Sequence, residues 1–115
     1  MSAVEPLVPS RYVVEGLFHD VLRGLRVVYV SSSVEGRRVF ERVEPLCQGH
    51  DGFALRRVAG EQRVSFAPSG GQVVFVASAV ACRGHVADVV YVARRDLDPT
   101  VLAPMVAAGG ELVQA

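Results

Sequence analysis

Two short segments of the chain pair a cysteine with a histidine at the spacing of a zinc knuckle. Two residues separate Cys47 from His50, and two separate Cys82 from His85. Two cysteines and two histidines form the closed ligand set of a structural zinc ion, which would make the chain a small zinc-stapled regulatory protein. The alternative, which we favour, is two buried free thiols and two loop histidines, so we expect no cofactor.

Arginine doublets are the second feature that could bind a ligand. They occur at residues 37–38, 56–57 and 94–95, and the chain has no lysine. Guanidinium groups bind phosphate and carboxylate groups through paired hydrogen bonds. The doublet at 94–95 also follows an apolar strand, at the end where α/β proteins place ligands. The candidate contact residues for a phosphate or an acidic partner are Arg56, Arg57, Arg94 and Arg95. Ordinary pairing with surface carboxylates is the alternative.

Charge balance and missing residue types exclude several activities. Twelve basic residues balance twelve acidic ones, whereas tight non-specific nucleic-acid binding needs a basic surface. A role as a nucleic-acid-binding accessory module therefore stays open but is not favoured. Because the chain has no lysine, it has neither the phosphate-binding lysine of a P-loop nor a side chain for Schiff-base catalysis. The serines at 31–33 lack the G-x-S-x-G elbow of a nucleophile, and His19 and Asp20 diverge on a helix. We predict no catalytic residues and no enzymatic activity.

Helical and extended patterns alternate along the chain. Apolar residues at helical spacing predict a helix over 11–23, ended by Gly24, and the valine-rich run 25–30 predicts a strand covered on both faces. Ser32 begins a second helix with capping-box spacing to Glu35. The later elements expected are short strands and a hairpin over 53–79, a central parallel strand over 88–93, a last helix from Asp98 toward Gly109, and a short strand at 111–113. The order predicts a small three-layer α/β domain with a central, mainly parallel sheet and an attached β-hairpin.

The length of 115 residues fits one domain. We expect residues 1–9 to be a flexible lead-in and residues 10–115 to form a single α/β domain. The first residues lack the basic start and apolar core of a signal peptide, and the longest uncharged apolar-rich run, over 72–82, is too short to span a membrane. We therefore expect a cytoplasmic protein with reduced thiols and no membrane contact.

Three stretches carry a resemblance to a known family. They are LRGLRVVYVSSSVEGRRVFERV, which places a strand between two helices, the hairpin RVSFAPSGGQVVFVAS, and the strand RGHVADVVYV. In this order they resemble the ATPase core of phage terminase large subunits and related helicase-like P-loop NTPases. The resemblance covers roughly residues 13–95 and rests on the order and spacing of elements.

The chain departs from that family where the family's chemistry resides. The glycine-rich loop with its Lys-Thr would fall near residues 9–12, but no glycine precedes Gly16, so no run of backbone amides can hold phosphates there. The aspartate and glutamate that hold magnesium and activate water would fall at Ala93 and Arg94. The resemblance thus implies a degenerate, non-catalytic relative from a phage or mobile element that acts through protein contacts in a bacterial host cell.

Self-association is the partner that we expect. The chain begins after the position of the family's P-loop strand, so the sheet should have an exposed edge that invites pairing. The apolar face of the first helix is also broader than one neighbour needs. The candidate oligomer-interface residues are Val14, Leu17, Phe18 and Val21. We predict a homodimer; the alternative is a monomer in which the C-terminal ELVQA closes the edge.

Overall fold

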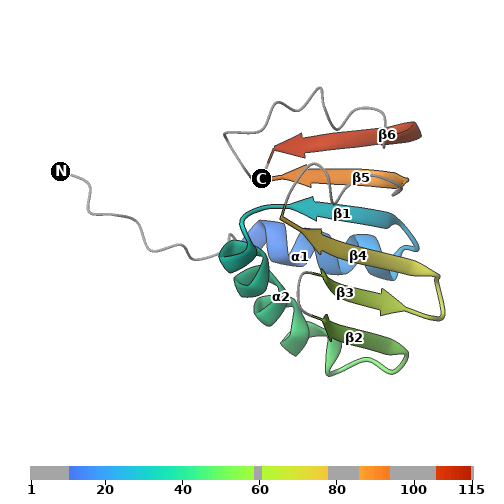
Figure 1. Cartoon of the computed structure of the whole chain (residues 1–115). Coiled ribbons are helices and arrows are strands. Elements are labelled where there is room, and N and C mark those ends of the chain that lie inside the picture. The colour runs from blue at the N-terminus through green and yellow to red at the C-terminus, as the bar shows by residue number, and fades with distance from the viewer. Residues whose placement is uncertain (1–10, 59–60, 78–85, 94–105, 115) are drawn as a thin grey trace.

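The computed structural model describes residues 11–58, 61–77, 86–93 and 106–114, and Figure 1 shows their arrangement. The described elements are α1 (Arg11–Leu22), β1 (Arg26–Val30), α2 (Ser33–Cys47), β2 (Phe53–Val58), β3 (Glu61–Phe66), β4 (Gly71–Val76), β5 (Ala87–Val92) and β6 (Val106–Gln114). The strands form one six-stranded sheet in the order β2-β3-β4-β1-β5-β6. Neither α1 nor α2 is long and apolar enough to cross a membrane.

The sheet is parallel on one side and antiparallel on the other. β1 pairs in parallel with both β4 and β5, and β5 pairs in parallel with β6. β3 pairs antiparallel with both β2 and β4, so residues 53–76 add a meander to the parallel strands. The predicted α/β fold, with a mainly parallel sheet and an attached hairpin, is confirmed.

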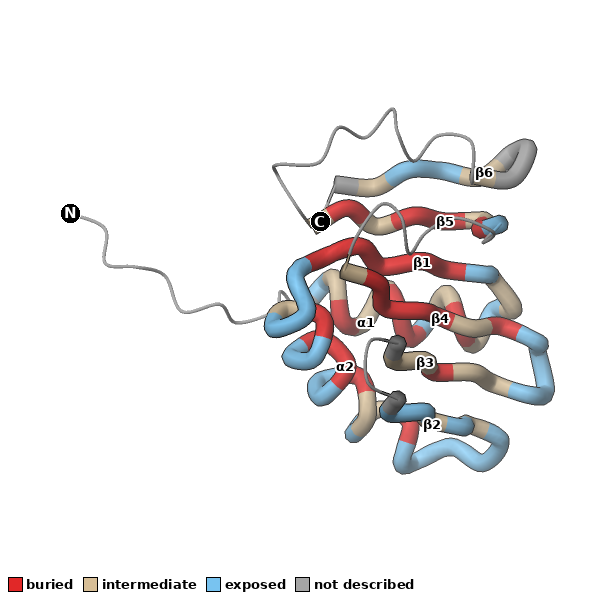
Figure 2. Tube along the Cα trace, in the orientation of Figure 1, coloured by how far each residue is buried: buried red, intermediate tan, exposed pale blue. Residues whose placement is uncertain are grey.

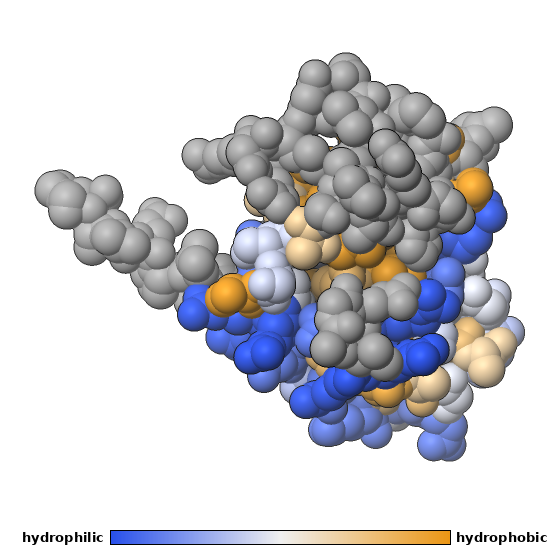
Figure 3. Space-filling view, viewed as in Figure 1, coloured by the Kyte–Doolittle hydropathy of each residue, from blue (hydrophilic) through white to orange (hydrophobic). Residues whose placement is uncertain are grey.

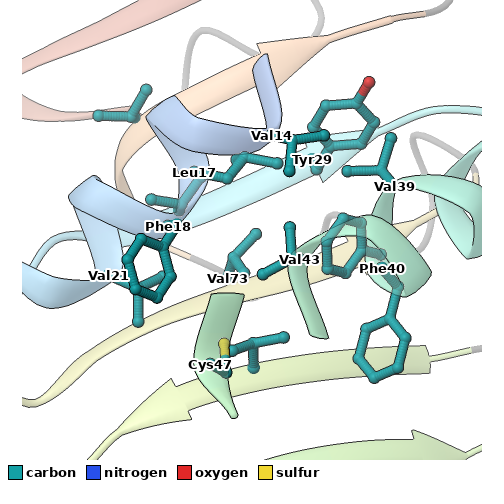
Figure 4. Close-up of a cluster of buried hydrophobic side chains, with 14 residues drawn as sticks. Val14, Leu17, Phe18, Val21, Tyr29, Val39, Phe40, Val43, Cys47 and Val73 are labelled. Atoms are coloured by element: carbon teal, nitrogen blue, oxygen red, sulfur yellow. The ribbon is translucent and has the colours of Figure 1, made fainter. Parts of the chain in front are cut away.

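Helix α1 buries the face that its sequence marks as apolar. Val14, Leu17, Phe18 and Val21 are 7%, 0%, 8% and 1% exposed. They belong to one cluster with residues of α2 and the sheet, and Figure 4 shows side chains of both helices converging on it. The prediction that these four residues form an oligomer interface is therefore wrong. The apolar face of α1 is broad because it contacts both α2 and the sheet within the same chain.

Helix α2 begins as the sequence predicts. Ser32 is the N-cap, and its Oγ accepts a hydrogen bond from the backbone N–H of Glu35 at 3.2 Å, which satisfies a donor of the first turn. The buried residues of the helix are Gly36, Val39, Phe40, Val43 and Cys47. They join the cluster that α1 enters, so both helices cover the same face of the sheet. In Figure 1, α1 lies behind β1 and β4.

The central strands are buried on both faces. Residues that alternate with those under the helices form a second cluster in β1, β4 and β5. Its buried valines are Val28, Val30, Val74, Val76, Val90 and Val92. Figure 2 shows burial concentrated in these three strands and exposure along β2. The uninterrupted valine runs thus mark strands covered on both sides, as predicted. The helix expected to begin at Asp98 would supply a third layer, and residues 94–105 lie outside the described chain.

The C-terminal part of the chain differs from its prediction. The sequence predicts that residues 106–108 end a helix, but they begin strand β6, which pairs in parallel with β5. The register shifts between the pair Ala87–Val106 and the pair Val89–Glu111, so β6 holds more residues than β5 over this interval. The expected strand at 111–113 is confirmed as the regular part of β6. The alanines of this segment favour a helix, but hydrogen bonding to the buried strand β5 outweighs that local preference.

Candidate functional site

The carboxyl ends of the parallel strands meet at one edge of the sheet, where α/β proteins place ligands. Backbone hydrogen bonds hold these ends together. The N–H of Ser31 donates to the C=O of Val76 at 3.0 Å, and the N–H of Ala93 donates to the C=O of Val30 at 2.8 Å. Ala93 directly follows β5 and brings only a methyl group to this edge.

Ser31 is a buried polar residue at this edge, with 1% of its surface exposed. Its Oγ donates to the C=O of Ser32 at 2.9 Å. A Cβ at Gly36 would lie 3.0 Å from that Oγ, so glycine lets the first turn of α2 approach the strand end closely. The serines at 31 and 32 therefore build the strand-to-helix turn, in agreement with the capping pattern.

The structure describes one half of the predicted zinc ligand set. Cys47 is 2% exposed, and burial, with a smaller effect of Glu44, raises the pKa of its thiol to about 11. His50 is exposed, and its ring centroid lies 5.4 Å from that of Phe18 and 6.1 Å from that of Phe53. The other two candidates, Cys82 and His85, lie outside the described residues. In the described ranges, no three His, Cys, Asp or Glu residues group to hold a metal ion, and the four-residue zinc site stays a prediction.

The doublet at residues 56–57 is divided between the two faces of the sheet. Arg57 lies on the helix side, where its guanidinium forms an ion pair with Glu44 and its Cζ lies 5.3 Å from the ring centroid of Phe40. This arrangement ties β2 to α2. Arg56 lies on the opposite side, because successive residues of a strand face opposite ways.

On the face opposite the two described helices, Arg56 stands directly across from Arg63 of β3 in the strand register. The Nη1 of Arg63 donates to Oε1 of Gln72 at 3.4 Å, and Arg56 is exposed. Two like charges directly opposite one another destabilise a strand pair. Sequence reasoning nominated Arg56 and missed Arg63, because only the hairpin register brings them together. Arg94 and Arg95 lie outside the described residues.

A second ion pair joins the amino ends of β1 and β5. The Nη2 and Nε of Arg26 donate to Oδ1 and Oδ2 of Asp88 at 3.1 and 3.2 Å, and the backbone N–H of Arg26 donates to Oδ2 at 2.8 Å. These hydrogen bonds lower the pKa of Asp88 and raise that of Arg26. The pair holds parallel neighbours in register, so we assign it a structural role.

Asp20, considered with His19 as a catalytic pair, has a structural partner instead. The hydroxyl of Tyr91 on β5 donates to its Oδ2 at 2.9 Å. A Cβ at Gly16 would lie 3.3 Å from that hydroxyl, so the glycine leaves room for the tyrosine to cross under α1. Burial, followed by the effect of Asp20, raises the pKa of Tyr91. The contact fastens α1 to β5.

Comparison with known proteins identifies the fold. No protein-family model matches the chain, and no curated protein matches it. Among solved structures, it is similar to the large terminase of a thermophilic bacteriophage, a structure in complex with ADP, with a TM-score of 0.53 and 13% sequence identity. The match covers 85% of this chain but only 28% of the terminase chain. This chain therefore has a terminase-like fold.

Proposed function

We propose that this chain is a non-catalytic protein of terminase-like fold that acts through contacts with other proteins. The observation that carries the proposal is the end of β5, where Ala93 stands at the carboxyl edge of the sheet. In the ATPases that the chain resembles, the matching strand ends in carboxylates that hold magnesium and orient water. A methyl group can do neither, and Arg94, the next residue in sequence, would repel the metal ion.

The composition of the chain supports the same proposal at the phosphate-binding end. A P-loop holds nucleotide phosphates with backbone amides of a glycine-rich loop and with a lysine. This chain contains no lysine and has no glycine before Gly16. The terminase of similar fold was solved in complex with ADP, and we propose that the present chain has lost that capacity.

Exposed apolar side chains support a role in protein contacts. Tyr12 is 84% exposed, and Val34 and Val86 are each 56% exposed. Tyr12 and Val34 lie in the first turns of α1 and α2. Such side chains can be buried by a partner without disturbing the core. From the terminase-like fold we propose a phage or mobile-element origin and a place of action in the cytoplasm of a bacterial host.

Nucleotide binding is tested by thermal unfolding with millimolar Mg-ATP, with magnesium alone as control. A ligand at about one hundred times its dissociation constant stabilises a protein by about 2.7 kcal/mol, which corresponds to a shift on the order of 10 °C for a domain of this size. We expect no shift and no phosphate release above that of buffer. A shift of several degrees that requires the nucleotide contradicts the proposal, and an active P-loop ATPase serves as positive control.

A nucleic-acid-binding accessory role is the second candidate. Arg37, Arg38 and Arg42 are exposed on α2, and a helix with three arginines on its outer side can contact phosphates. Glu41 lies among them, and the net charge is zero, so we place this role second. Retention on DNA that falls steeply with rising salt, and that is lost when Arg37 and Arg38 are changed to Gln, would favour it.

Self-association remains part of the proposal, at a different surface from α1. The sequence predicts an exposed sheet edge where the family's P-loop strand is missing. β6 pairs with β5, so the C-terminal segment covers the outer edge of β5. β6 is thus the border strand on the parallel side of the described sheet. Its Leu112 is 37% exposed, and we propose this strand as the surface of self-association. Light scattering coupled to size exclusion measures the mass. A value near 12.3 kDa over a wide concentration range excludes the dimer.

A further inference from the structure

We draw no further inference here: the strongest candidate, the hydrophilic surface patch along β2 at the antiparallel border of the described sheet (Figure 3), fixes no partner because nothing in the described residues shows what covers it.

Discussion

Substitution of Gly71 by alanine is the sharpest test of how α1 docks on the sheet. Gly71 begins β4 and is buried against the end of α1. An added Cβ would lie 2.8 Å from the carbonyl carbon of Val21, closer still to its oxygen, and 3.0 Å from Cα of Gly24. These are backbone atoms, so no side-chain rotation can relieve the overlap.

The structure also sets the size of the effect. To make room, the end of α1 must move away from the turn before β4. Two hydrogen bonds oppose that movement: Ser69 Oγ donates to the C=O of Val21 at 2.8 Å, and the N–H of Gln72 donates to the C=O of Leu25 at 3.0 Å. Overpacking of a core costs about 1–3 kcal/mol, and each lost hydrogen bond about 1 kcal/mol. We therefore expect Gly71→Ala to lower the free energy of unfolding by about 3 kcal/mol or more, a large share of the roughly 5–15 kcal/mol typical of a domain.

Urea unfolding followed by circular dichroism measures this loss, with two other glycines as controls. At Gly49 no atom lies within 4 Å of an added Cβ, so Gly49→Ala should be neutral or stabilise slightly by restricting the unfolded chain. Gly70 has equally open surroundings but a φ of +77°, so Gly70→Ala should cost about 1–2 kcal/mol through backbone strain alone. If Gly71→Ala lies within about 0.5 kcal/mol of Gly49→Ala, the close approach of α1 to β4 is refuted.

The remaining predictions concern polar and metal-binding groups. Tyr91→Phe removes the hydrogen bond to Asp20 and should cost about 1 kcal/mol at neutral pH in urea unfolding. The folded pKa of Tyr91 lies above its ordinary value of 10.0. The stability that this hydroxyl contributes is therefore present below pH 10 and is lost as the pH rises further. In alkaline titrations, Tyr91→Phe should consequently lose less stability than the parent chain. The pKa of Asp88 is lowered in the folded chain by its hydrogen bonds with Arg26. The ionised carboxylate therefore stabilises the fold above its unfolded pKa, and this stability is lost on acidification. The melting temperatures of Asp88→Asn and the parent chain should converge in acid. If zinc is bound by Cys47, His50, Cys82 and His85, metal analysis should find about one equivalent and a chelator should lower the melting temperature; metal content near zero rejects the site.

Elements with strong local signals could be predicted from the sequence. Gly24 follows α1 with a φ of +89°, a conformation that glycine adopts without strain, and Ser32 caps α2 through its own side chain. The valine run of β1 is buried on both faces, with Val27 in one apolar cluster and Val28 and Val30 in the other, as an uninterrupted apolar run predicts. In each case the residue type and its immediate neighbours determine the local conformation, so the position of the element follows.

Features that depend on distant partners could not be predicted in the same way. Arg26 and Asp88 are 62 positions apart, and nothing near either residue indicates the other. The apolar face of α1 is the same whether its own sheet or a second chain covers it, so its pattern cannot distinguish a core from an interface. The alanines around Val106 favour a helix, yet its pairing with Ala87 of β5 outweighs that local preference.

The doublet at 56–57 shows why adjacent identical residues need the structure before a role is assigned. Arg57 points toward α2, where it contacts Glu44 and the ring of Phe40. Because successive residues of a strand face opposite ways, Arg56 lies on the face opposite the described helices, across from Arg63. Loss of Arg57 should therefore lower stability, because its ion pair with Glu44 and its contact with Phe40 disappear, whereas loss of the exposed Arg56 should change stability little. The same residue type thus has a structural partner at one position and not necessarily at the next, and only the strand register distinguishes the two positions.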